Sequence, residues 1–87
     1  MKIKDGFILR EVADSFIVVA VGEAVKTFNG IVNLNETGAF LWKILEQGAT
    51  KEELLKRLTA EYDVDDATAK KDIDAFVEKL EEAKLVK

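Results

Sequence analysis

The 87-residue sequence contains no cysteine, no histidine and no proline. Without cysteine the chain can form no disulfide and no reactive thiolate, and we expect it to be cytoplasmic. Without histidine it lacks the commonest general base and metal ligand. Its one serine, Ser15, falls in a predicted turn, with no base to activate the hydroxyl. We therefore predict a protein that is not an enzyme and that needs no cofactor.

Other absences exclude a membrane protein and disfavour a nucleic-acid-binding one. No apolar run approaches the roughly 20 residues that span a bilayer, and no apolar segment typical of a secretory signal follows Met1. The net charge is -4, whereas nucleic-acid-binding surfaces are basic. What remains is 48% hydrophobic and 34% charged, which is typical of a globular protein. At this length we expect one domain that covers residues 1–87.

Three nearby carboxylates, Asp63, Asp65 and Asp66, are the only hint of a metal site. Counting a calcium-binding loop from Asp63 places Thr68 where the turn requires glycine. The same carboxylates suit the start of a helix, where a side-chain oxygen accepts from free backbone amides. We predict a helix cap and no metal.

The first third of the sequence has the pattern of β-structure. Residues 7–12 and 16–21 are rich in β-branched and aromatic side chains and predict two strands. The second run is apolar on both faces, so we expect it to be central and covered on both sides or nearly so. Asn29-Gly30 is a strong hairpin signal between residues 25–28 and 31–34. These last two runs are two strands, or one irregular strand with a bulge, so either could be the edge of the sheet.

The rest of the sequence predicts three helices. They cover residues 36–47 after the N-cap Asn35, 51–62 after a capping box that begins at Thr50, and 66–83 after Asp65. The first has an apolar stripe of Thr37, Phe40, Leu41, Ile44 and Leu45, and the third has one of Ala69, Ile73, Phe76, Val77, Leu80 and Ala83. Trp42 falls outside the first stripe, so we expect it to close the rim of a small core or, alternatively, to contact a partner.

Strands followed by helices give an α+β fold. Two short helices joined at Gly48 and a longer third one resemble a helix-turn-helix beside a small antiparallel sheet, and we predict a winged-helix-like arrangement with three to four strands. Residues 85–86 should fold back onto the core.

Two functions fit such a fold. An edge strand beside a helix can accept an extended peptide as an additional strand, at residues 31–34 or 25–28. The alternative is a winged-helix transcription regulator, which the acidic third helix disfavours because phosphate contacts need basic side chains. A weaker alternative is an adaptor that binds a folded protein. A free edge could also pair two copies, so a monomer and a homodimer both remain open.

Four segments, taken in order, resemble the signatures of the PqqD family. They are Leu34-Asn35-Glu36-Thr37-Gly38-Ala39-Phe40-Leu41-Trp42, Thr50-Lys51-Glu52-Glu53-Leu54, Glu61-Tyr62-Asp63-Val64-Asp65 and Asp72-Ile73-Asp74-Ala75-Phe76-Val77-Glu78-Lys79-Leu80. The resemblance covers nearly the whole chain, from the first strand to Leu85.

This resemblance implies a small peptide chaperone. Members of the family bind the leader of a ribosomally made precursor peptide and present it to a modifying enzyme, in the namesake case a radical SAM maturase of PQQ biosynthesis. The leader adds to the third strand and packs against the third helix. Carried over to this sequence, the resemblance implies that the peptide-binding residues are Ile31, Val32, Asn33 and Leu34 on the strand and Asp72, Phe76 and Lys79 on the helix; Asp72 and Phe76 match the family signature.

Overall fold

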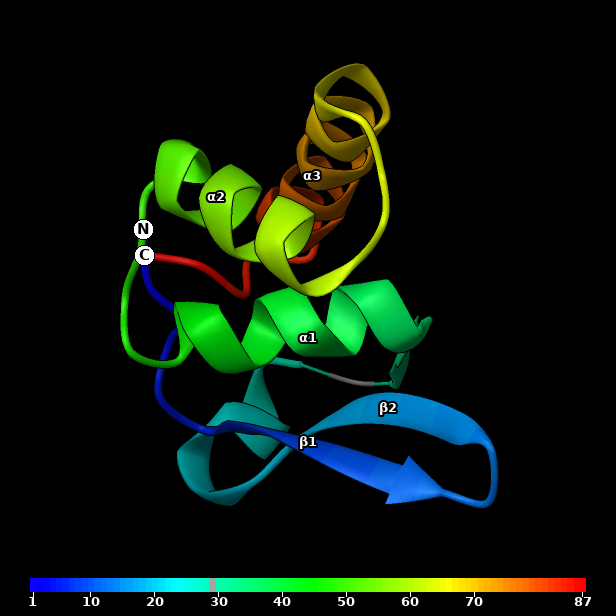
Figure 1. The fold of residues 1–87 in the computed structure, drawn as a ribbon. Helices are drawn as coiled ribbons and strands as arrows, with labels where there is room; N and C mark the ends of the chain where they lie inside the picture. The colour runs from blue at the N-terminus through cyan, green and yellow to red at the C-terminus, as the bar shows by residue number, and fades with distance from the viewer. Residues whose placement is uncertain (29) are drawn as a thin grey trace.

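The structure is a computed structural model that describes residues 1–28 and 30–87. It contains a three-stranded antiparallel sheet, in the order β1-β2-β3, followed by three α-helices (Figure 1). The predicted α+β fold is confirmed. The elements are β1 (Phe7–Val12), β2 (Ser15–Ala20), the 3-10 helix η1 (Gly22–Lys26), β3 (Val32–Leu34), α1 (Glu36–Leu45), α2 (Lys51–Glu61) and α3 (Asp66–Glu82).

Helix α1 is the central layer of the molecule. Figure 1 shows it between the sheet on one side and α2 with α3 on the other. A helix in that position must present apolar side chains in two directions. Six of its ten residues are accordingly buried: Gly38, Ala39, Leu41, Trp42, Ile44 and Leu45.

The central position of α1 corrects the prediction for its two aromatic residues. Trp42 is 0% exposed, so it belongs to the centre of the core and not to its rim. Phe40, expected at the centre, is only half-buried and packs edge-to-face on Tyr62, with ring centroids 5.4 Å apart. The predicted stripe described one buried face, whereas α1 has two, and Trp42 lies on the second.

The segment between β2 and β3 also differs from the prediction. Residues 25–28 do not form a strand, because Gly22–Lys26 is a 3-10 helix and the backbone amides of Thr27 and Phe28 donate to the Ala24 carbonyl. Phe28 then packs edge-to-face on Phe7, with ring centroids 5.3 Å apart. Of the predicted Asn29-Gly30 turn, Asn29 lies outside the described residues. Of the two runs that could have been an edge, residues 25–28 and 31–34, only the second contains a strand, and that strand is β3.

The sheet is covered by helices on one face only, as Figure 1 shows. Strand β2 is central, as predicted, and Val18 is buried beneath the helices. Cross-strand partners share a face, so Ile8 with Val19, and Ile17 with Arg10, lie on the opposite face. Ile8, Ile17 and Val19 are partly exposed there. The expectation that helices or strands cover both faces was wrong.

The predicted helix starts are confirmed. The Asn35 side chain accepts from the Gly38 amide at 2.7 Å, and the Asp65 carboxylate accepts from the Thr68 amide at 2.7 Å. Thr50 and Glu53 form the reciprocal capping box. Each interaction satisfies amides that have no partner within their own helix, and so fixes where the helix begins.

The two ends of the chain lie side by side. Ile3 and Val86 form an antiparallel bridge, and the Lys87 amide donates to the Lys2 carbonyl at 2.9 Å. Leu85 is fully buried. The C-terminal residues therefore fold back onto the core, as predicted.

The cap of α3 should make stability depend on acid. The hydrogen bond from the Thr68 amide lowers the pKa of Asp65 from its ordinary 3.8. A lowered folded-state pKa contributes stability that is present above pH 3.8 and is lost as the pH falls through the folded-state value. Asp65→Asn keeps a capping side chain that does not titrate, so we expect a flatter fall of the urea midpoint from about pH 5 to pH 2, followed by circular dichroism.

Asp63→Asn is the matched control, because it removes a neighbouring carboxylate that caps no described helix. Its acid profile should follow that of the parent protein. Equal slopes for Asp65→Asn and the parent protein would contradict the prediction.

Candidate functional site

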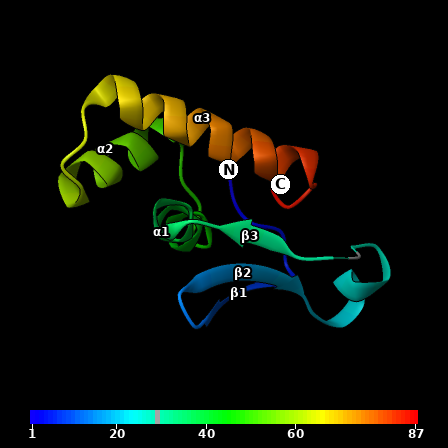
Figure 2. The ribbon, with the colours of Figure 1, turned by 90° about the vertical axis from the view of Figure 1, so that its right-hand side faces the viewer.

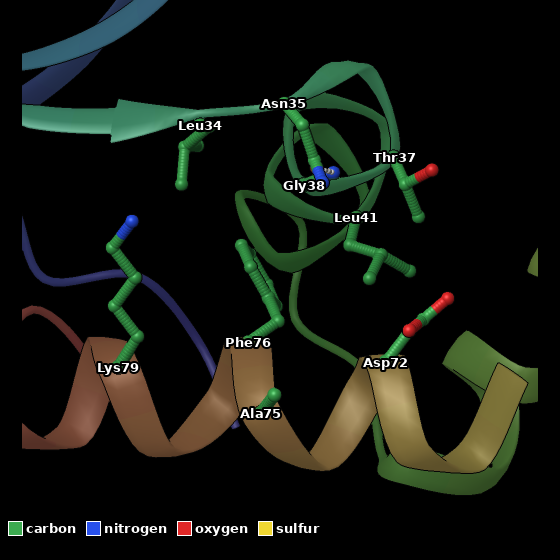
Figure 3. Close-up of a pocket in the computed structure, with 9 residues that line it drawn as sticks. All are labelled: Leu34, Asn35, Thr37, Gly38, Leu41, Asp72, Ala75, Phe76 and Lys79. Carbon is green, nitrogen blue, oxygen red and sulfur yellow. Dashed lines mark hydrogen bonds between the residues drawn. The ribbon is translucent and has the colours of Figure 1, made fainter. Parts of the chain in front are cut away.

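A groove runs between β3, the start of α1 and one face of α3 (Figure 3). Its volume is about 250 Å³. The residues that line it, which we call the groove residues, are Leu34, Asn35, Thr37, Gly38, Leu41, Asp72, Ala75, Phe76 and Lys79. They come from three elements that are distant in sequence, so the groove exists only in the folded protein.

One wall is the edge of the sheet. Strand β3 pairs with β2 alone, so its other side has no strand partner among the described residues. Figure 2 shows α3 beyond that free side, with β1 and β2 on the far side of β3. The unpaired edge of the sheet therefore faces a helix.

Asn33 directs its backbone into the groove. Its carbonyl oxygen accepts a hydrogen bond from Lys79 Nζ at 2.6 Å, and Lys79 belongs to α3. In an antiparallel strand the N–H and C=O of one residue point to the same side, so the Asn33 amide also faces the free edge. Val32 and Leu34 direct theirs to β2. Each residue of β3 therefore directs both its N–H and its C=O to the same side, either to β2 or to the free edge.

The second wall is a single face of α3. Asp72, Ala75, Phe76 and Lys79 are spaced by three and four residues, which places them above one another on the helix. Phe76 is 7% exposed and forms the apolar centre of this wall. Asp72 and Lys79 are exposed charges at its two ends, about 10 Å apart along the axis. The wall is thus apolar in the middle and carries opposite charges at its ends.

The start of α1 closes the groove. The Asn35 cap fixes the turn from β3 into the helix. At Gly38, an added Cβ would lie 3.3 Å from Leu34 Cβ and 3.2 Å from Asn35 Oδ1, so glycine lets strand and helix approach closely. This junction sets the direction in which the edge of β3 faces.

The structure brings together four of the seven predicted binding residues, Leu34, Asp72, Phe76 and Lys79, as groove residues. Asn33 lies at the rim through its backbone. Val32 is 7% exposed and packs in the core below the groove. Ile31 precedes β3, is 59% exposed and does not line the groove.

Five groove residues were not predicted from the sequence to bind a peptide: Asn35, Thr37, Gly38, Leu41 and Ala75. The first four belong to the strand-to-helix junction, where the working surface was expected but where the residues themselves were assigned to a helix cap and a core stripe. Ala75 could have been predicted, because a small residue between Asp72 and Lys79 on one face of a helix leaves room for a ligand.

The charges and the helices limit what the site can bind. Helix α3 has six acidic residues, Asp66, Asp72, Asp74, Glu78, Glu81 and Glu82, against three lysines, so it is a poor surface for phosphates. In residues 1–28 and 30–87, no cluster of carboxylates could hold a metal ion. None of the described helices is long and apolar enough to cross a membrane.

Comparisons with known proteins identify similar sequences and folds. Residues 15–86 match the sequence profile of Coenzyme PQQ synthesis protein D (PqqD). The solved structure of TbiB1 in complex with the TbiA(beta) leader peptide is 26% identical, with 100% of this chain and 95% of that chain covered and a TM-score of 0.78. Lasso peptide synthetase B1 complexed with the leader peptide is 23% identical, with 97% and 93% covered and a TM-score of 0.73, and shows a shared fold. The search of curated proteins gave no match.

Proposed function

Because the chain belongs to the PqqD family, we propose that it is a non-catalytic peptide-binding chaperone that receives the leader of a ribosomally made precursor peptide. Residues 1–87 act as one recognition domain in the cytoplasm. The chaperone presents the bound precursor to a separate modifying enzyme, a radical SAM maturase or another enzyme of that role. Holding the leader raises the effective concentration of the rest of the precursor at the enzyme.

One observation carries this proposal: the unpaired edge of β3 faces the apolar centre of α3 across an open groove. A peptide that lies along β3 as a fourth strand would pair its backbone with the N–H and C=O of Asn33. Its alternate side chains would point toward Phe76 and Leu34. Backbone pairing supplies affinity for any extended peptide, whereas the side-chain contacts supply selectivity.

The comparison with TbiB1 supports the same use of the fold. That protein was solved with a leader peptide bound, and the likeness extends over the whole of this chain. The non-catalytic role is supported by the chemistry available, since the sequence has neither cysteine nor histidine and the groove holds one carboxylate, Asp72, and one amine, Lys79. An isolated carboxylate and a distant amine do not form a nucleophile–base pair.

The test is a backbone-amide NMR titration with leader segments of short peptides encoded beside the gene. Shifts concentrated in Val32–Leu34 and in residues 72–79 would support peptide binding in the groove. If the peptides left the spectrum unchanged while duplex DNA moved it in a salt-dependent way, the proposal would be overturned in favour of the transcription regulator.

A pair of substitutions at Asn33 separates backbone pairing from side-chain contacts. Asn33→Pro removes the edge N–H, while the pairing of Val32 and Leu34 with β2 is retained, because proline is tolerated on edge strands. We expect leader affinity, measured by calorimetry, to fall about tenfold through the lost hydrogen bond. Asn33→Ala keeps both backbone groups and should bind as the parent protein does.

Both variants should retain the parent amide spectrum away from β3. If Asn33→Pro, correctly folded, bound the leader with undiminished affinity, strand addition at β3 would be excluded.

A further inference from the structure

The groove is bridged in the free protein by a single polar contact. Lys79 Nζ reaches from α3 to the Asn33 carbonyl, at 2.6 Å, across 46 positions of sequence. Figure 3 shows the Lys79 side chain extended from the helix toward the strand beside Leu34. Among the described residues this is the only side-chain hydrogen bond between α3 and the sheet. It therefore spans the space in which a peptide strand would lie.

The contact occupies the acceptor that an added strand needs. The Asn33 carbonyl points to the free edge, where an incoming strand would donate an N–H to it. Lys79 and a peptide amide compete for this oxygen. A lysine placed at an edge strand also discourages pairing with other chains, so the contact protects the edge when no peptide is bound.

Among the residues that the structure describes, the Lys79 ammonium group has no charged partner. No described carboxylate lies within 4.0 Å of Lys79 Nζ; the ion pairs of the described residues are Lys26 with Glu23 and Lys51 with Asp74. The nearest acidic groove residue, Asp72, sits at the other end of the wall. Lys79 thus donates to a neutral carbonyl, and a carboxylate would be a stronger acceptor for it.

Building on the function proposed above, we propose that Lys79 is a latch and a selectivity residue. In the free protein it closes the edge of β3. When a leader adds as a strand, Lys79 releases the Asn33 carbonyl to a peptide amide and pairs with an aspartate or glutamate of the leader. The groove therefore selects peptides with an acidic side chain opposite Lys79, at the C-terminal end of the α3 wall.

The released lysine remains at the groove because its backbone is fixed in the middle of the last two turns of α3. Its long flexible stem lets the ammonium turn from the strand edge to a side chain of the peptide without any movement of the helix. The exchange replaces one hydrogen bond, from the ammonium to a neutral carbonyl, by two, one of which joins the ammonium to a carboxylate. The ion pair between Lys79 and an acidic leader offsets the loss of the Lys79–Asn33 hydrogen bond. A neutral leader offers Lys79 no such pair.

The test combines selection from a random displayed peptide library with three variants. Lys79→Met keeps the apolar stem and removes the charge and the donor. Lys79→Glu reverses the charge. Lys71→Met is the matched control, since Lys71 is an exposed lysine of the same helix that does not line the groove. The parent protein and Lys71→Met should enrich peptides with Asp or Glu at one position, Lys79→Met should lose that enrichment, and Lys79→Glu should favour Lys or Arg.

One selected peptide then gives the quantitative result. Changing its acidic residue to the amide should weaken binding to the parent protein about fivefold and leave binding to Lys79→Met unchanged. In the free protein, Lys79→Met should shift the carbonyl ¹³C resonance of Asn33, whereas Lys71→Met should not. An unmoved carbonyl resonance would overturn the latch.

The outcomes of the selection distinguish the selectivity role of Lys79 from peptide binding in the groove, which is the function proposed above. If peptides bind in the groove but Lys79→Met selects the same acidic residues, the selectivity role is overturned while peptide binding stands. If no peptide is enriched by any of the proteins, the proposed function is overturned, and this inference with it.

Discussion

Replacing Ala75 with tryptophan is expected to weaken leader binding by about 10- to 100-fold, because an indole there fills the groove. Ala75 is an exposed residue of the α3 wall, between Asp72 and Lys79, and the groove holds only about 250 Å³. The indole would pack on Phe76 and occupy the space that the peptide side chains need. Isothermal calorimetry with the leader peptide measures the loss.

The control for this substitution is Ala60→Trp. Ala60 is an exposed alanine on α2 that lies outside the groove, so the variant adds the same side chain to a helix surface without obstructing the peptide. Its affinity should equal that of the parent protein. If Ala75→Trp retained full affinity while its new indole was shielded from solvent quenchers, the peptide would have to bind elsewhere.

The largest expected effect on stability comes from Trp42. It is 0% exposed in the layer between the sheet and the outer helices, and truncation to alanine should cost about 3–5 kcal/mol. Small domains have total stabilities of about 5–15 kcal/mol, so Trp42→Ala should be unfolded or nearly so at 37 °C. Urea unfolding followed by circular dichroism measures the change without relying on the lost indole fluorescence.

Trp42→Phe is the informative companion. The indole Nε1 of Trp42 is buried and has no hydrogen-bond partner among the described residues. Phenylalanine removes that unpaired donor, which offsets part of the loss of packing. We expect Trp42→Phe to be clearly more stable than Trp42→Ala. Equal destabilisation by both would contradict this ranking.

Local signals in the sequence predicted most of the fold. The caps at Asn35, Thr50 and Asp65 were found because a capping side chain and its amide are three residues apart, so the interaction is visible in a short window. The first two strands were found in the same way, from their own composition. Structural features that depend only on residues close together in the sequence were therefore predictable.

The errors arose where distant packing decides the outcome. Trp42 was misplaced because periodicity within α1 cannot say that other elements cover this helix on two sides. Residues 25–28 were expected to form a strand, but the 3-10 helix Gly22–Lys26 forms there, and Phe28 just beyond it packs on Phe7 of β1. In both places contacts with another element, which a local pattern does not contain, decided the outcome.

The candidate site was only partly predictable for the same reason. Phe76 and Asp72 could be named from a helix pattern and a family signature, and the structure places both on the wall of the groove. That Lys79 reaches Asn33, 46 positions away, follows from no local pattern. The sequence predicted which elements form the site, and the contacts between them came from the structure.

The paired chain ends have a practical consequence for protein engineering. Because Ile3 bridges Val86 and Lys2 bonds Lys87, a short linker could join the termini and new ends could be opened at the β1–β2 turn, where Ala13 and Asp14 are exposed. No residue of that turn lines the groove. The domain is thus suited to circular permutation, and to insertion into a loop of a host enzyme as a portable docking module that enters and leaves the host at one point.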